Sequence, residues 1–461
     1  MRSNVQSPTV SVPVSSASWW TVLDGYQRQV FILATLAWLF DCLGQQVFVI
    51  ARNPAVSSLM PPGTSAVTLK EWGGYVTSIF VIGWATGGLI FGAVGDRIGR
   101  ARGLAITVLL YGLCTGLSGF SRGITDFCVY RFITGLGVGG VFGLAVALCA
   151  DGLPDRSRPP ALGLLQALSA MGNMIAGAAA VALGYRKLIH PDSGDAWRWL
   201  FILGAIPALL CVAFQFRLRE PEKWVTARAQ GKITGVRFGS YASLFGVARW
   251  RKNALFGMLL CVAGVVGLWG IGFFSPELVS YVTMQNVPPA QRPGRGLMWV
   301  GVTMIVQNFG SFLGMMAFTK LAQRHGRKKI FALSAVCAYV STVVAFKFLT
   351  HPWQIFVFCP VMGFFQLALF AGFAIYLPEL FPLRLRSTGA SFCYNVGRFA
   401  AASGPFTLGV LQLHLAQGAA TPAAKMDAFR DACCWVASIY LLALLALPFL
   451  PETKGQPLPE D

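Results

Sequence analysis

The chain has 461 residues, of which 55% are hydrophobic and only 12% are charged, and its formal net charge is +19. Soluble domains carry about 25% charged residues, so this composition leaves too little polarity to cover a surface that faces water. It excludes an ordinary soluble domain and predicts a polytopic membrane protein.

Apolar runs of membrane-spanning length recur along the whole chain. A helix needs about 20 apolar residues to cross the hydrocarbon core of a bilayer. In the first half of the chain the runs are 28–50, 71–93, 102–120, 126–149, 160–184 and 197–216. In the second half they are 254–275, 297–319, 329–350, 353–377, 386–411 and 427–450. The sequence therefore predicts an all-α membrane protein with twelve transmembrane helices.

Polar segments divide these runs into two sets of six. We expect a cytosolic N-terminal tail at 1–27, a six-helix bundle at 28–216, a cytosolic linker at 217–253, a second six-helix bundle at 254–450 and a cytosolic tail at 451–461.

The basic residues lie in short loops between the runs and form no single patch, so nucleic-acid binding is not expected. With the N-terminus inside, the inside segments hold about 24 Lys and Arg and the outside segments about 8. This bias follows the positive-inside rule and predicts that both termini are cytosolic.

Cofactor chemistry has no signal in the sequence. The eleven cysteines lie mostly in apolar runs without CxxC or CxxH spacing, so no metal site is predicted. Paired carboxylates and a Ser/His/Asp set are also missing, and the four histidines lie in loops or at span ends. We therefore expect no enzyme and no cofactor.

The two halves share a short motif. The loop after the second span reads GAVGDRIGRAR (92–102), and the loop after the eighth reads TKLAQRHGRKK (319–329). The matched pairs are Gly99 with Gly326, Arg100 with Arg327, and Arg97 with Arg324. Repeated halves are typical of secondary transporters, which bind substrate between the halves near the membrane midplane.

Six motifs, taken in order, resemble those of the major facilitator superfamily. They are GAVGDRIGR with its degraded copy AQRHGRKK, RFITGLGVGG (131–140), REPEKW (219–224), YLPELFPLRLRSTG (376–389) and PETKG (451–455). The resemblance covers the whole chain. It implies two pseudo-repeated six-helix bundles, transport by alternating access and a monomeric protein.

Two segments resemble the metabolite–proton symporter branch of that superfamily, which includes sialic acid, aromatic acid and nicotinate carriers. These are PELFPLRLRSTG and the YNVGR segment at 394–398, of which the second is closest to the sialic acid type. The first span departs from the D-G-x-D pattern of the branch, because Asp41 is followed by Cys42, Leu43 and Gly44. Asp41 is thus the only acid deep in this span.

The resemblance implies a gate at the cytosolic ends of the helices. Asp96 would bridge neighbouring helices in one conformation and release them in the other. We also expect Arg386 to pair with Glu379, and Glu222 with nearby basic residues. The predicted gate residues are Gly92, Asp96, Arg97, Gly99, Arg100, Glu222, Arg324, Gly326, Arg327, Glu379 and Arg386. The alternative is a solvated basic loop that only sets the topology.

Arg398 is the most unusual charge in the spans. It lies about 18 Å into the eleventh span, close to the midplane, and no acid of the second half has that depth. A carboxylate fits a guanidinium through two parallel hydrogen bonds. We predict that Arg398 binds a substrate carboxylate; the alternative is that helix carbonyls and polar neighbours satisfy it.

Asp41 and Arg131 are candidates for proton coupling. By helical rise they lie at similar depths in the first and fourth spans, which are neighbours in the resembled fold. A carboxylate is favoured beside an arginine and is protonated when the arginine moves away. The alternative is a static ion pair.

Uncharged polar side chains near the midplane complete the predicted substrate site, although each alone could serve helix packing instead. They are Gln45, Gln46, Gln166, Asn173, Gln307, Asn308, Gln366, Tyr394 and Asn395, with Trp269 as an aromatic wall.

Together these features predict a proton-coupled symporter of a small organic anion, such as a carboxylate metabolite, in the inner (cytoplasmic) membrane. Its partners would be the anion, protons and the lipid bilayer. The alternatives are an uncoupled facilitator or a proton antiporter for sugars, aromatic acids or drugs.

Overall fold

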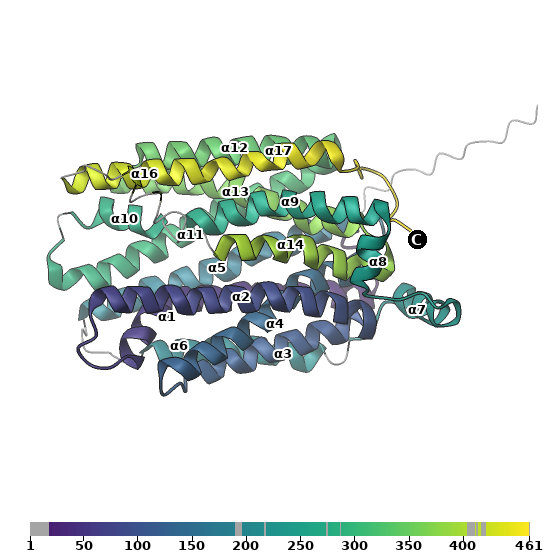
Figure 1. Ribbon diagram of the computed structural model, residues 1–461, viewed down its shortest axis with the longest axis horizontal. Coiled ribbons are helices and arrows are strands. Elements are labelled where there is room, and N and C mark those ends of the chain that lie inside the picture. The colour runs from purple at the N-terminus through teal and green to yellow at the C-terminus, as the bar shows by residue number, and fades with distance from the viewer. Residues whose placement is uncertain are drawn as a thin grey trace, which may run out of the picture.

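The computed structural model describes residues 18–189, 196–215, 218–272, 275–285, 287–402, 411, 414–415 and 421–460. All regular secondary structure in these ranges is helical. The long helices run side by side along the longest axis of the molecule (Figure 1). This is the arrangement expected where every backbone polar group must be satisfied inside a bilayer.

The first half holds six long helices, and two shorter ones follow it. They are α1 (Gly25–Leu59), α2 (Ala66–Ile98), α3 (Arg100–Ser118), α4 (Ile124–Gly152), α5 (Arg158–Ile189), α6 (Ala196–Gln215), α7 (Glu222–Thr234) and α8 (Tyr241–Gly246). The second half holds α9 (Ala248–Gly272), α10 (Ser275–Thr283), α11 (Arg292–His325), α12 (Arg327–Phe348), α13 (Ile355–Glu379), α14 (Arg386–Ala402), α16 (Pro422–Ala437) and α17 (Leu442–Ala446).

Eleven helices in the described residues are long and apolar enough to cross a membrane. The remaining predicted span, 386–411, contains α14 as far as Ala402, and 403–410 lie outside the described residues. The last residues of the predicted linker 217–253 belong to α9, which begins at Ala248. Its first turns read ARWRKN, and their polarity hid the start of the helix from a hydropathy count.

Glycines let the helices approach closely, as small residues do in membrane bundles. A Cβ on Gly87 of α2 would lie 1.9 Å from the carbonyl oxygen of Leu136 on α4. The two halves meet in the same way along α5 and α11, where a Cβ on Gly177 would lie 2.9 Å from the carbonyl oxygen of Gly301. Contacts between α2 and α14 form the second seam between the halves.

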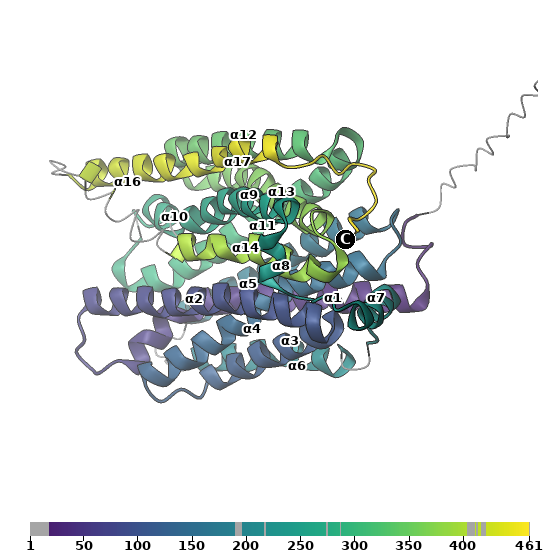
Figure 2. The ribbon, with the colours of Figure 1, turned by 45° about the vertical axis from the view of Figure 1, so that its right-hand side comes forward.

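The linker helices α7 and α8 and the C-terminus lie at one end of the bundle (Figures 1 and 2). We call this the linker end. Helices α3 and α12 both begin there, directly after Gly99 and Gly326.

Candidate functional site

Arg398 of α14 is buried between the two halves, with 2% of its surface exposed. Its Nη1 donates to the carbonyl oxygen of Tyr394 at 2.9 Å and to Oδ1 of Asn395 at 3.0 Å. The guanidinium carbon lies 3.9 Å from the ring centre of Trp84 on α2 and 4.3 Å from that of Tyr394. Its Nε has no hydrogen-bond partner among the described residues. The cation is therefore stabilised on one side and retains an unused donor.

Asp41 of α1 supplies the opposite charge from the first half. It is fully buried, and Gln45 donates to its Oδ2 at 2.8 Å. Its other oxygen, Oδ1, has no hydrogen-bond partner in the described part of the chain. Asp41 and Arg398 interact electrostatically. Among the acids of the second half none has the depth of Arg398, and sequence analysis missed that Asp41 of the first half lies close enough to interact with it.

Aromatic rings lie around Arg398. The rings of Trp84 and Trp269 meet edge to face, with centroids 5.4 Å apart. Tyr394 stacks on Phe142 of α4, with centroids 3.8 Å apart. The central cavity between them holds only about 10 Å³ and is lined by Val81, Trp84, Trp269, Arg398 and Ala401. That volume suits about one water molecule, so a metabolite needs the halves to move apart.

The predicted pair of Asp41 and Arg131 is wrong for this conformation. Within the described residues, Arg131 bonds instead to Ser118 Oγ, Thr134 Oγ1 and the carbonyl oxygen of Cys114. Its guanidinium lies 5.6 Å from the ring of Phe48, seven residues beyond Asp41 on α1. Seven residues of helix span about 10 Å, so Arg131 lies about two turns along α1 from Asp41.

The other predicted polar residues divide by location. Trp38 of α1 donates to Oε1 of Gln166 at 3.0 Å, and its ring packs on Phe142, next to the central site. Asn173 donates to Asn308 at 2.9 Å across the seam between α5 and α11. Gln366 donates to Thr342 at 2.8 Å within the second half, away from that seam. Gln46 and Gln307 are half-buried.

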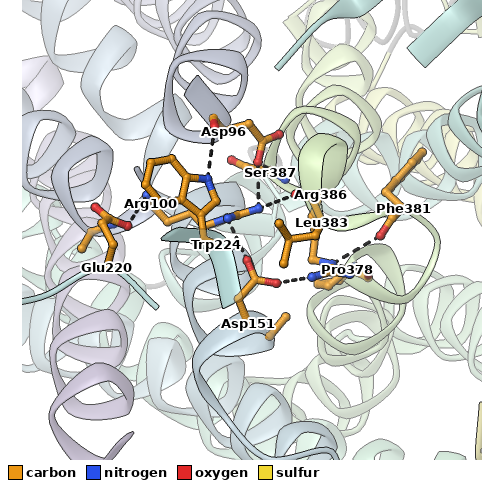
Figure 3. A network of polar contacts seen from close by, with 12 residues as sticks. Asp96, Arg100, Asp151, Glu220, Trp224, Pro378, Phe381, Leu383, Arg386 and Ser387 are labelled. Carbon is orange, nitrogen blue, oxygen red and sulfur yellow. Dashed lines mark hydrogen bonds and ion pairs between the residues drawn. The ribbon is translucent and has the colours of Figure 1, made fainter. Parts of the chain in front are cut away.

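A second polar network joins the halves at the linker end (Figure 3). Arg100 pairs with Asp96 at 3.0 Å and with Asp151 of α4 at 2.9 Å. Asp151 also pairs with Arg386 of α14. Asp96 accepts hydrogen bonds from the backbone N–H and hydroxyl of Thr388 at 2.8 and 2.7 Å. We call these five residues the latch.

Glycine and glutamate together build the turn beside the latch. Gly99 has φ +120°, and a Cβ there would lie 2.2 Å from the carboxylate of Glu220. Glu220 accepts from the backbone N–H groups of Arg100 at 2.8 Å, Ala101 at 3.2 Å and Arg102 at 3.0 Å. This carboxylate satisfies the free N–H groups at the start of α3.

The second half repeats this turn. Gly326 has φ +94°, and Glu452 accepts from the N–H groups of Arg327 at 2.9 Å and Lys328 at 3.1 Å. Arg327 pairs with Glu379 at 2.8 Å, and the Thr453 hydroxyl also donates to Glu379. The copy lies wholly within the second half, whereas the latch joins both halves.

Two predicted gate contacts are wrong. Arg386 pairs with Asp151 and also donates to the carbonyl oxygen of Pro378, whereas Glu379 pairs with Arg327. The position of Arg386 at the start of α14 turns it toward α4. The linker carboxylate that takes part is Glu220 and not the predicted Glu222, because Glu220 is the one that reaches the N–H groups at the start of α3. The remaining gate residues lie beside the network: Arg97 and Arg324 are exposed, and Gly92 packs against Ser391.

Sequence reasoning missed three groups of the site. Asp151 comes at the end of one apolar run, and Glu452 follows another. A lone carboxylate in such a place was the available signal. Trp84 lies about midway along the second span, the depth estimated for Arg398. No group of three or more metal-ligating side chains occurs among the described residues.

Comparisons with known proteins place this geometry in a family. The chain matches the Major Facilitator Superfamily over residues 53–405. The fold is that of the proton:xylose symporter XylE from E. coli, with a TM-score of 0.73 at 19% identity over 94% of this chain and 98% of that one.

Three relatives are similar in sequence. A Haemophilus influenzae protein assigned to metabolite transport is 30% identical, over 84% of this chain and 88% of its own. A Cupriavidus pinatubonensis protein assigned to 4-methylmuconolactone transport is 28% identical over 95% and 94%. The cis,cis-muconate transport protein of Acinetobacter baylyi is 29% identical over 73% and 78%.

The fold and the paired halves thus define a multi-pass membrane transporter, and not an enzyme. The chain belongs to the Major Facilitator Superfamily.

Proposed function

We propose that this protein is a proton-coupled symporter that takes up a small organic acid through its carboxylate. One observation carries the proposal: a buried Arg398 with an unused Nε donor and a buried Asp41, one from each half, interact electrostatically. Buried ionisable groups inside a membrane bundle mark substrate or proton pathways.

Charge accounting suggests how the two ligands are coupled. Without substrate, the carboxylate of Asp41 balances the guanidinium of Arg398. A substrate carboxylate that binds Arg398 adds one negative charge to a buried site, which is costly in a medium of low dielectric. A proton on Asp41 restores neutrality. We therefore expect one proton to accompany each carboxylate group that Arg398 binds.

The relatives favour a particular substrate class. Two of them are named for muconate and methylmuconolactone, compounds derived from aromatic rings. The rings of Trp84, Trp269 and Tyr394 offer flat apolar surfaces for such a molecule. This supports an aromatic or ring-cleavage acid ahead of the sialic acid favoured by the YNVGR segment.

In this mechanism the linker end faces the cytosol of a bacterial inner membrane, as the distribution of basic loops predicts. The latch then closes the cytosolic side. Substrate and proton would enter from outside, and opening of the latch would release them inside. A ligand drives such a change only through different contacts in the two states, and contacts to both halves meet that condition.

Uptake into proteoliposomes tests this proposal. Labelled cis,cis-muconate, benzoate, nicotinate and sialic acid would be offered to purified protein, with and without an inward proton gradient. We expect gradient-dependent accumulation of at least one ring-derived acid, and its loss in Arg398→Ala. Equal uptake with and without the gradient would exclude coupling. Full uptake by Arg398→Ala would exclude the carboxylate contact.

A further inference from the structure

A basic pocket at the linker end plays no part in the transport mechanism described above. It has a volume of about 320 Å³ and lies between the end of α2, helix α7 and the segment that joins α7 to α8. Its walls carry four cations, and no carboxylate is among its lining residues, all of which the structure describes. The polar lining residues are Arg97, Arg228, Lys232, Arg237 and Ser240.

One of the arginines that line this pocket has a buried donor. Nη1 of Arg228 is buried without a hydrogen-bond partner in the described part of the chain. The Arg228 guanidinium lies 5.0 Å from the ring centre of Trp224, which holds it in place. The indole of Trp224 in turn donates to the carbonyl oxygen of Asp96 at 3.1 Å. Arg228 is therefore fixed relative to the end of α2.

The backbone on both sides of Ser240, which lines the pocket, is also anchored. Gly239 donates from its N–H to the carbonyl oxygen of Arg384 at 3.0 Å. With φ +62°, a Cβ on Gly239 would lie 2.3 Å from the carbonyl oxygen of Ala93. The hydroxyl of Tyr241 donates to the carbonyl oxygen of Leu89 at 2.7 Å. The pocket is thus a built concavity and not the chance arrangement of a loose loop.

Four cations around one cavity repel one another, and a bound anion relieves that repulsion. A phosphate group suits this pocket, because arginine binds phosphate with two parallel hydrogen bonds and lysine adds a point charge. We propose that the pocket binds the phosphate group of an anionic lipid.

The surroundings favour a lipid over a free phosphate compound. Three apolar side chains on α7 and just after it are exposed: Val225 by 50%, Ile233 by 86% and Val236 by 43%. A segment that exposes both apolar and basic side chains at the end of a membrane bundle suits the lipid interface. Val236 and Phe238 line the pocket itself and can contact the lipid beyond its phosphate.

Native mass spectrometry of the purified full-length protein tests this proposal. The protein would be titrated with phosphatidylglycerol and, separately, with phosphatidylcholine, which has no net charge. The pocket variant is Arg228→Gln/Lys232→Gln. The control Lys223→Gln/Lys252→Gln removes the same charge from exposed positions outside the pocket. Because each basic residue near an anionic lipid adds to the attraction, we expect at least about tenfold weaker phosphatidylglycerol binding in the pocket variant alone.

A second arm distinguishes the two sources of phosphate. Inorganic phosphate and glycerol 3-phosphate would be offered without lipid. One result would assign the pocket to a soluble phosphate and overturn the lipid proposal. In that result, binding of these compounds depends on Arg228 and Lys232, while phosphatidylglycerol binds every variant equally. Equal losses in the pocket and control variants, or no loss in either, would overturn the site itself. Should the double variant fail to fold, the exposed Arg237→Gln takes its place.

Discussion

Arg398 shows how the chain keeps a cation inside a bilayer. An arginine at the middle of a membrane helix costs at least about 2.5–3.5 kcal/mol. Here hydrogen bonds to Tyr394 and Asn395 and the ring of Trp84 offset that cost. The contacts leave Nε unused, and this donor is the part of the site that a ligand can still engage.

Asp41 is the residue that should carry the coupled proton. In Asp41→Asn the site would be neutral with substrate bound and no proton, so a proton gradient could no longer drive uptake. We expect exchange of labelled for unlabelled substrate to persist while uphill accumulation falls to background. The control Asp431→Asn alters an exposed carboxylate that pairs with Lys347 and should accumulate normally. Gradient-driven accumulation by Asp41→Asn would rule out this role.

At the scale of the helices, the starts of α3 and α12 depend on glycine and a distant carboxylate. Gly99 needs both its positive φ and the space that Glu220 occupies. Gly235 also has a positive φ, +74°, but a Cβ on it would meet no atom within 4 Å. Replacing Gly235 therefore measures the cost of the positive φ alone.

Replacing these two glycines should separate strain from collision. We expect Gly235→Ala to cost about 1 kcal/mol of stability, as left-handed alanine does. Gly99→Ala should cost more, because Glu220 must also move away from the start of α3. Thermal unfolding in detergent measures the difference. If both variants lose the same thermal stability, Glu220 does not depend on the space that Gly99 leaves free.

The stability of the corresponding turn in the second half, at Gly326, should depend on pH through Glu452. Burial raises the pKa of Glu452, but N–H donation from Arg327, Lys328 and Lys454 outweighs burial and lowers this pKa below its ordinary value. A lowered folded-state pKa contributes stability above the ordinary value of about 4.3, and that stability is lost as pH falls through the folded pKa.

The difference in thermal stability between wild type and Glu452→Gln should accordingly be largest near neutral pH. It should shrink as the pH is lowered below about 4. Glu460→Gln, near the end of the described chain, serves as the control. A difference that stays constant with pH would mean that the charge of Glu452 does not stabilise the start of α12.

How well each helix could be predicted depended on how clearly its residues differ in polarity from the neighbouring loops. Long apolar runs located the spans, but the start of α9 was missed because Arg249, Arg251 and Lys252 make its first turns polar. The loop motif predicted that Asp96 and Arg100 are gate residues, and both belong to the latch. The partners Asp151 and Arg386 are 235 positions apart. Their contact arises from packing of α4 against α14, which no local pattern in one sequence encodes.

On the scale of the whole molecule, the structure is closed at its centre and at the linker end. The central cavity of about 10 Å³ cannot hold a metabolite, and the latch ties Asp96 and Asp151 of the first half to Thr388 and Arg386 of the second. The sequence could not tell which conformation is adopted, because alternative states of a transporter share one sequence and differ in the contacts between halves.

The central claim is that a carboxylate binds to Arg398 between the halves. The most direct test is calorimetric binding of matched acids and amides, benzoate with benzamide and nicotinate with nicotinamide, to wild type and Arg398→Gln. For the transported acid we predict at least about tenfold tighter binding than its amide, or about 1.4 kcal/mol, in the wild type alone. An amide that binds as tightly as its acid, or an undiminished acid preference in Arg398→Gln, would contradict the account.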